Sequence, residues 1–375
     1  MTAALRPSRV LDQAEKDLRA LWSAPPTPGQ TPKTRACTMN LVLVVPGASL
    51  ERWGPIVDDV LQGVPARAIV VGLEPDGTDE LDASVSAVCT PGGGTVVCSE
   101  RVTLRVGGAI CGRVASCVDA LCAADVPTTL VWPARVRVED PAFAPLARWS
   151  HRVVLDASSG SLASLAHVVL WARGRPQGER PGIAELAWTR LGPWQELCAR
   201  MFDDARARDL ATAVTRVRLV QASAPGASLG AEGALLLGWL ATRLGWKASS
   251  LAGQLRLLRT DGGHIQVQLH ADAGSPAPRG GLLAVEIEAR RDGAELRGEV
   301  ARACGEARGE DRGGTWRVEL DAGGETRRVE QRVRTFADDP ARTLERTLRR
   351  RVRDDALVES ALWADELGSD ELVCG

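Results

Sequence analysis

Two places in the sequence combine residue types and spacing that could bind an anion. Gly107 and Gly108 stand between a predicted strand and the start of a helix, where free backbone N–H groups and the helix dipole favour negative charge. Asp156 ends the run RVVLD, at the end of a predicted parallel strand, where α/β domains bind their ligands. An ordinary tight turn and a helix cap are the alternative interpretations of these two features.

Two cysteines have a spacing that could support redox chemistry. Cys89 and Cys98 flank a predicted hairpin turn, and we expect them to lie diagonally across the ladder, within reach of each other after a small adjustment. Exposed thiols would favour a redox role, and burial among the neighbouring valines would argue against one. The nine cysteines include no CxxC spacing, so neither a disulfide scaffold nor a metal site is indicated.

The common catalytic motifs are absent. The chain contains no GxGxxG, Walker, HExxH or GxSxG sequence, and it has no tyrosine that could act as an acid or base. Its four histidines are scattered along the chain. We therefore predict no catalytic residue and no bound cofactor.

The composition and net charge of the chain exclude some classes of partner. Apolar residues make up 45% and charged residues 25% of the 375, which is typical of folded globular domains. The net charge of -2 gives no field that would attract nucleic acid. The longest apolar stretch, residues 231–246, contains Glu232 and Arg243 and is too short to cross a bilayer. Because no secretion signal begins the chain, we expect a cytoplasmic location.

The first half of the chain predicts an α/β domain. Residues 1–33 form a helix followed by a proline-rich tether, and this helix either folds back on its own domain or docks on another protein. Four continuously apolar runs, at 41–45, 68–72, 128–132 and 152–156, predict buried parallel strands. Helical patterns lie between them, so we expect a layered α/β domain over 34–178 with a mainly parallel sheet and an inserted hairpin.

The second half predicts an α+β domain over 179–375. Five alternating segments from residue 264 onward are separated by glycine-rich turns, which indicates an antiparallel meander with one wet face. Asp339 as N-cap and Pro340 at the first helical position then start a helix. We expect its apolar stripe, Leu344, Leu348 and Val352, to cover that sheet.

Two tryptophan-rich blocks have strong helical patterns. They are ELAWTRLGPWQELCARMFD at 185–203 and ALLLGWLATRLGWK at 234–247, the second apolar on nearly every side. Packing into the protein's own core and a partner surface are both open interpretations.

These blocks resemble the glucose-6-phosphate dehydrogenase assembly protein family, OpcA. Three more blocks resemble the family in the same order: RACTMNLVLVV at 35–45, VPTTLVWP at 126–133 and RWSHRVVLDAS at 148–158. The sequence departs from the family pattern at Val131, where a tryptophan is expected, at His151, where an aspartate is expected, and at Ala157 in place of a serine.

The resemblance implies a non-catalytic protein that binds glucose-6-phosphate dehydrogenase, promotes its active oligomer, and in some lineages links redox state to NADPH supply. Trp188, Arg190, Trp194 and Trp239 are then candidates for contacting the partner or for shaping the contact surface, because Trp and Arg dominate interface hot spots. The alternative function is an α/β protein, either an enzyme or a binding protein, that binds a sugar phosphate or nucleotide near Gly107, Gly108 and Asp156.

Overall fold

The described residues form two compact units. The computed structural model describes residues 7–23, 33–92, 94–159, 161–251, 254–303, 313–333 and 339–368. The first unit takes residues up to 160, 167–186 and 339–354, and the second takes 161–166, 187–338 and those from 355 onward. The chain therefore leaves the first unit and returns to it late in the sequence.

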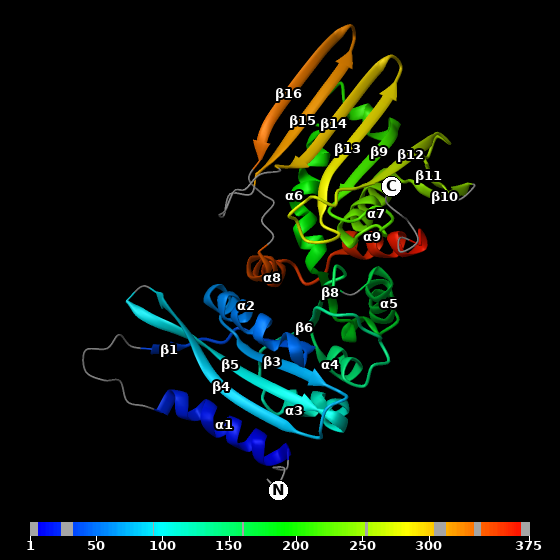
Figure 1. Cartoon of the computed structure of the whole chain (residues 1–375). Helices are drawn as coiled ribbons and strands as arrows, with labels where there is room; N and C mark the ends of the chain where they lie inside the picture. The colour runs from blue at the N-terminus through cyan, green and yellow to red at the C-terminus, as the bar shows by residue number, and fades with distance from the viewer. Residues whose placement is uncertain are drawn as a thin grey trace. The chain divides into compact units, whose positions relative to one another are not determined.

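The first unit is built on an eight-stranded, mainly parallel sheet (Figure 1). Its strands run in the order β1-β5-β3-β2-β6-β7-β8, with β4 paired to β5. The bounds are β1 (Lys33–Arg35), β2 (Asn40–Pro46), β3 (Arg67–Glu74), β4 (Leu81–Gly92), β5 (Thr95–Gly107), β6 (Thr128–Trp132), β7 (Arg152–Leu155) and β8 (Gly182–Glu185). From β5 to β8 this is the doubly wound order of dinucleotide-binding sheets.

The four apolar runs form the centre of this sheet, as predicted. Leu41, Val70, Leu130 and Val154 are all buried, because helices cover both faces of a parallel sheet. The inserted hairpin is also confirmed, and its second strand β5 pairs in parallel with β3 while β4 runs antiparallel beside it. The sheet continues to β8, beyond the change in sequence texture near residue 180.

Helices of the first unit flank the sheet. They are α1 (Pro7–Ser23), α2 (Leu50–Gly63), α3 (Val114–Asp119), α4 (Phe143–Trp149), α5 (Leu162–Arg173), which the division between units cuts, and α8 (Pro340–Arg349). The N-terminal helix α1 lies beside β4, where Ala14 and Leu18 are buried and the Trp22 indole donates to Glu100 at 2.6 Å (Figure 1). The helix thus folds back on its own unit.

Helix α8 begins with the predicted N-cap, but it packs against a different element from the one predicted. The Asp339 carboxylate accepts hydrogen bonds from the backbone N–H groups of Ala341 and Arg342, with Pro340 in the first turn. The expectation that this helix covers the antiparallel sheet is wrong, because α8 packs on α2 and buries Leu344 and Leu348 in the core of the first unit.

A buried arginine explains where α8 ends. The Arg152 side chain, 4% exposed, donates to the carbonyl oxygens of Leu348, Arg350 and Arg351, each at 3.3 Å. These carbonyls lack partners within the helix, so the guanidinium satisfies them. The chain leaves the helical path here and Val352, predicted to be buried, is 49% exposed.

The second unit has its own eight-stranded sheet, in the order β10-β11-β12-β9-β13-β14-β15-β16. The bounds are β9 (Val214–Gln221), β10 (Lys247–Leu251), β11 (Gln254–Leu258), β12 (His264–Ala271), β13 (Leu282–Arg291), β14 (Ala294–Arg302), β15 (Gly314–Ala322) and β16 (Glu325–Val333). The meander from β13 to β16 is antiparallel as predicted, whereas β12 pairs in parallel with β9.

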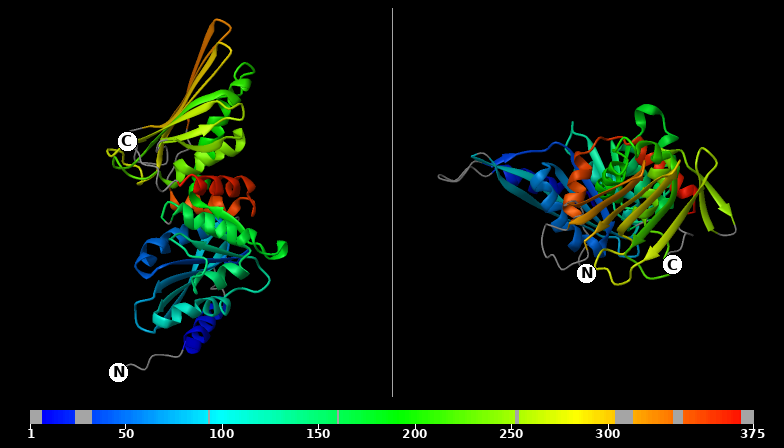
Figure 2. Two further views of the ribbon diagram at one scale, coloured as in Figure 1. Left: turned by 90° about the vertical axis from the view of Figure 1, so that its right-hand side faces the viewer. Right: turned by 90° about the horizontal axis from the view of Figure 1, so that it is seen from above.

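Helices pack against one face of this sheet, and among the described residues no helix covers the other face. Helices α6 (Leu186–Arg200) and α7 (Ala231–Leu244) run along one side of the strands, and α9 (Asp355–Glu366) packs on α7 (Figure 2). The alternation along each strand fits this arrangement, since Val285, Ile287 and Ala289 are buried while the residues between them are partly exposed. The predicted single wet face is confirmed.

The close approach of α7 and α9 depends on a glycine. A Cβ at Gly238 would overlap the backbone carbonyl oxygen of Ser360 on α9. Since this neighbour is backbone, it cannot move aside by changing a rotamer. The glycine of the LLLGWLA block is therefore a packing residue.

We expect Gly238→Ala to destabilise the protein by up to about 2 kcal/mol, measured as a lower urea midpoint. Alanine favours a helix by about 1 kcal/mol over glycine, but overpacking against a backbone atom costs about 1–3 kcal/mol. Gly112→Ala is the control, because a Cβ there meets nothing within 4 Å. Equal midpoints for the two variants would show that α7 and α9 have room to separate.

Candidate functional site

In a doubly wound sheet, ligands bind at the carboxyl edge, where the strand order reverses. In this chain the reversal falls between β2 and β6, which pair in parallel. The turn after β2 reads PGAS and contains one glycine, Gly47. A Cβ at Gly47 would overlap the Glu74 side chain, so this carboxylate lies against the turn that would face a dinucleotide phosphate.

The predicted anion site at Gly107 and Gly108 already holds an anion of the chain. The Asp79 carboxylate accepts the backbone N–H of Ala109 at 2.6 Å, and Gly108 adopts a φ of 54° that lets the two approach. The chain here forms a 3₁₀ helix, Gly108–Arg113, before the six-residue helix α3, so no long α-helix begins at these glycines. A phosphate would have to displace Asp79.

Asp156 lies at the end of β7 as predicted, where it organises the following turn. Its carboxylate accepts the N–H of Ser158 at 3.2 Å and the hydroxyl of Ser159 at 3.0 Å. The next amide, Ala157 N–H, donates to Glu185 of β8 at 2.8 Å. Asp156 thus closes the turn of residues 156–159, six residues before α5 begins at Leu162. The hydroxyl of Ser161, rather than Asp156, accepts an N–H in the first turn of that helix, from Ser164 at 3.1 Å.

The structure does not bring these predicted residues together. Gly107 ends β5 and Asp156 follows β7, and three strands lie between these two. At about 4.8 Å per strand, the two ends are roughly 19 Å apart. A single small-molecule site formed by Gly107, Gly108 and Asp156 is therefore wrong, because the strand order separates them.

Negative charge gathers at this edge. Burial raises the pKa of the Cys111 thiol, and the carboxylates of Glu74 and Asp140 raise it further. The same field opposes the binding of a phosphate. Glu74, Asp79 and Glu185 were not predicted as site residues, since nothing in the local sequence shows which amide a distant carboxylate will reach.

The first tryptophan-rich block forms core rather than surface. Trp188 is 4% and Trp194 is 1% exposed, both on α6. Their burial excludes direct contact with a partner in this structure and leaves the predicted role of shaping the surface. Trp239, on α7, is half-buried.

The two blocks meet through a buried carboxylate. Glu232 of α7, 4% exposed, accepts from Arg190 of α6 at 2.6 Å and from the backbone N–H of Leu282 at 2.9 Å. Arg302 of β14 lies 3.7 Å from the same carboxylate and over the ring of Trp194. Arg190 thus joins α6 to α7 and to the sheet. A lone glutamate in an apolar helix was the sequence signal for such a pair.

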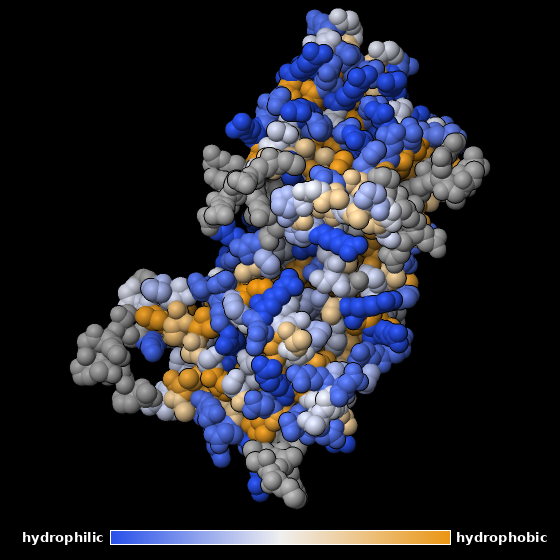
Figure 3. All heavy atoms as spheres, in the orientation of Figure 1, coloured by the Kyte–Doolittle hydropathy of each residue, from blue (hydrophilic) through white to orange (hydrophobic). Residues whose placement is uncertain are grey.

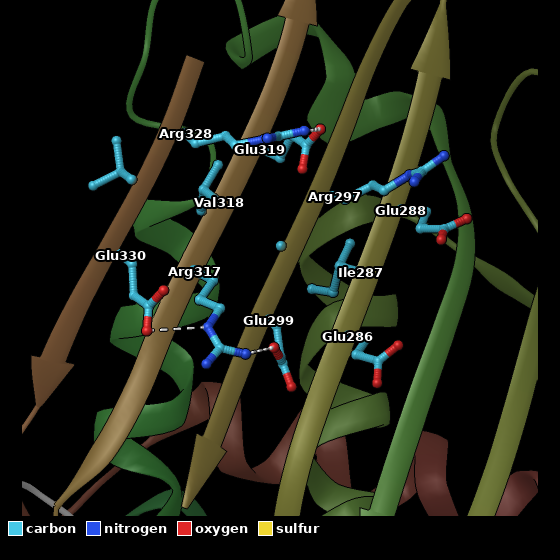
Figure 4. Close-up of a pocket in the computed structure, with 12 residues that line it drawn as sticks. Glu286, Ile287, Glu288, Arg297, Glu299, Arg317, Val318, Glu319, Arg328 and Glu330 are labelled. Atoms are coloured by element: carbon cyan, nitrogen blue, oxygen red, sulfur yellow. Dashed lines mark hydrogen bonds and ion pairs between the residues drawn. The ribbon is translucent and has the colours of Figure 1, made fainter. Parts of the chain in front are cut away.

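The open face of the second sheet carries a lattice of paired charges. A depression of about 490 Å³ lies over β13 to β16, and Arg317 extends between Glu299 and Glu330 (Figure 4). Arg328 pairs with Glu319 at 3.0 Å, and Arg216 pairs with Glu288. The face is mainly hydrophilic (Figure 3). Hydrogen bonds to Glu330 raise the pKa of Arg317, so these groups stabilise one another's charge and are poorly suited to proton transfer.

Cys89 and Cys98 form a disulfide with a Cα–Cα distance of 4.0 Å. They face each other directly across the β4–β5 ladder, so the expected diagonal placement is wrong. Cys89 is exposed and Cys98 is buried. Cys37, Cys111, Cys117, Cys122 and Cys198 are free thiols, and residues 304 and 374 lie outside the described residues.

The described part of the chain contains neither a cluster of metal ligands nor a membrane-spanning helix. There, no three His, Cys, Asp or Glu side chains come together in a way that could hold a metal ion. Within the same ranges, no helix has the length and apolar character needed to cross a membrane.

The fold and the carboxyl edge of the first sheet define the class of protein to which this chain belongs. This is a two-unit α/β protein with a doubly wound sheet order, in which the Asp79 and Glu185 carboxylates accept the backbone N–H groups of Ala109 and Ala157 at the carboxyl edge. The glucose-6-phosphate 1-dehydrogenase of Mycobacterium avium has a similar fold, with a TM-score of 0.50 at 11% identity over 90% of this chain and 94% of that one. The ketoreductase KijD10 of Actinomadura kijaniata gives 0.49 at 10% identity, over 88% and 97%.

Two family profiles match this chain and identify the family to which it belongs. The profile described as the glucose-6-phosphate dehydrogenase subunit N-terminal domain matches residues 57–169, and the corresponding C-terminal profile matches 181–362. The chain belongs to the OpcA glucose-6-phosphate dehydrogenase assembly family.

Relatives named OxPP cycle protein OpcA support this membership. The protein from Nostoc punctiforme is 27% identical over 79% of this chain, and the one from Synechococcus elongatus is 27% identical over 80%. The matches span 64% and 66% of the relatives' own lengths.

We expect Glu232→Gln to lower the free energy of unfolding by about 3 kcal/mol, because breaking a buried ion pair leaves Arg190 and Arg302 without their shared anion. The measurement is urea unfolding followed by tryptophan fluorescence. Glu319→Gln, which breaks the exposed pair with Arg328, is the control and should cost less than about 1 kcal/mol. Similar losses would mean that the buried network is dispensable.

Native alkylation with iodoacetamide at pH 8 should leave Cys89, Cys98 and Cys198 unlabelled. The first two form the disulfide, and burial raises the pKa of Cys198 to about 12, so its reactive thiolate is scarce at pH 8. Prior reduction should make Cys89 reactive while Cys198 stays protected. Mass spectrometry reads out each site, and labelling of both hairpin cysteines in unreduced protein would refute the disulfide.

Proposed function

We propose that this chain binds glucose-6-phosphate dehydrogenase, favours its active oligomer, and does not itself transform a metabolite. The observation that carries the proposal is the match of both halves of the chain to the dehydrogenase assembly family. By supporting active dehydrogenase, the protein would sustain NADPH production in the oxidative pentose phosphate pathway.

The ligand edge of the first sheet supports a binding role over catalysis. Asp79 and Glu185 accept the N–H groups of Ala109 and Ala157, and the Glu74 side chain lies over Gly47. Backbone amides at this edge bind phosphate in dinucleotide enzymes, and here internal carboxylates occupy the amides of Ala109 and Ala157. A sugar-phosphate or nucleotide site around Gly107, Gly108 or Asp156 is therefore the weaker candidate.

Activation of this kind needs no catalytic side chain. A protein that binds the active oligomer more tightly than the inactive one shifts the equilibrium by the difference in binding free energy. Couplings of about 1–3 kcal/mol correspond to changes of about 5- to 150-fold. Trp188 and Trp194 are buried and would act by holding α6 in place. Arg190 and Trp239 are half-buried, and Arg190 also forms the ion pair with Glu232.

The disulfide provides a basis for regulation. Reduction requires a thiolate to attack one of the two sulfurs, and exposed Cys89 is the accessible one. Cys98 pairs with Arg35 of β1, so the hairpin end also holds the strand that follows α1. We propose that thiol reduction modulates partner binding through this end of the hairpin.

Mixing the purified protein with its cognate dehydrogenase should raise the specific activity at least about 5-fold, in line with ordinary coupling energies. Light scattering should show a larger complex at micromolar concentrations. The protein alone should not reduce NADP with glucose 6-phosphate. Unchanged activity with separate elution of the two proteins, or turnover by the isolated chain, would contradict the proposal.

A further inference from the structure

Residues 349–353, RRRVR, form an exposed basic segment between α8 and α9. Arg349 pairs with Glu345 at 2.8 Å and donates to the Gly63 carbonyl at 2.7 Å. The side chains of Arg350, Arg351 and Arg353 form no ion pair or hydrogen bond with any residue that the structure describes. Three cations therefore project from one short segment without an internal anion.

The backbone under these cations is fixed. Arg152 binds the carbonyl oxygens of Arg350 and Arg351, and Gly182 lies so close to the Val352 carbonyl that a Cβ would overlap it. Because the backbone is already ordered, docking loses less conformational entropy than it would on a free loop. The segment is thus a preorganised display of positive side chains.

The buried arginine adds to the same field. Burial and the neighbouring Arg350 lower the pKa of Arg152, and the Asp354 carboxylate offsets part of this effect. Asp354 and Asp355 follow in sequence, and the charges of residues 349–355 still sum to about +2 at neutral pH. On the open face of the second sheet, by contrast, Arg317 and Arg328 are each paired with glutamate.

The composition of the segment fits a protein interface. Val352, 49% exposed, is an apolar centre with arginines around it, and Arg is enriched at interfaces. The segment contains no aromatic residue that could stack on a base, and the whole chain has a net charge of -2. These features favour an acidic protein surface over nucleic acid.

We propose that the basic segment 349–353 is a docking surface for a carboxylate-rich surface of the dehydrogenase. The inference rests on the proposed function and assigns one face of this chain to it. Charged groups at the rim of such an interface mainly steer association, so binding through this segment weakens as salt rises.

The test compares two triple variants with equal changes in net charge. Arg350→Gln/Arg351→Gln/Arg353→Gln removes the unpaired cations and leaves the carbonyls that Arg152 binds. Arg52→Gln/Arg113→Gln/Arg173→Gln, at exposed positions elsewhere in the first unit, is the control. Each protein is titrated with the cognate dehydrogenase by calorimetry at several NaCl concentrations, with circular dichroism to confirm folding.

The segment variant should raise the Kd about tenfold at low salt and flatten its salt dependence, while the control changes the Kd less than about twofold. If the wild type binds but the segment variant binds equally well with the same salt dependence, the inference is overturned and the proposed function stands. If the wild type does not bind dehydrogenase at all, the proposed function fails as well. Segment-dependent binding to duplex DNA in place of dehydrogenase would also overturn it.

Discussion

The first unit depends on one constraint. Backbone N–H groups at the carboxyl edge of a parallel sheet have no partner within the sheet. Such N–H groups need an acceptor, and in dinucleotide-binding enzymes a phosphate supplies it. Here Asp79 and Glu185 supply it from within the chain, and Asp156 does the same for the turn after β7. The amides of Ala109, Ala157 and Ser158 are thereby satisfied without a ligand, and the carboxylates that bind them oppose the approach of a phosphate.

The second unit meets a different constraint, which is how to join two apolar helices and a sheet in one orientation. Glu232 meets it with an ion pair to Arg190 and a backbone hydrogen bond to Leu282. Gly238 allows α9 to lie directly against α7. The two tryptophan-rich blocks therefore form mainly the packed interior of the second unit. A partner would contact a surface that this packing holds in place.

The fold likeness to a glucose-6-phosphate dehydrogenase has a simple physical interpretation. A sheet order can persist while the turn chemistry at its edge changes, because packing fixes the strands and a few loop residues determine the ligand site. In this chain the turn after β2 has one glycine and a carboxylate lies against it. The fold likeness alone therefore assigns no activity to this chain, and the basic segment 349–353 is the docking surface that we propose.

Local sequence was sufficient for elements whose signals are local. The apolar runs of β2, β3, β6 and β7, the meander from β13 to β16 and the Asp339 cap were all predicted, because burial on both faces, alternation and capping depend on neighbouring residues. Glu232, the one glutamate in an apolar helix, is a local signal typical of a buried ion pair, although no pair was predicted from it. Its partners Arg190 and Arg302, however, come from distant segments.

Tertiary structure decided everything that depends on long-range placement. Helix α8 packs on α2 rather than on the meander that precedes it in the sequence, because its stripe fits that core and Arg152 holds its end. Strand order separated Gly107 from Asp156, and folding brought Asp79 to the amide where an outside anion was expected. A sequence shows which groups need partners, but contacts between residues tens or hundreds of positions apart are set only when the sheets and helices assemble.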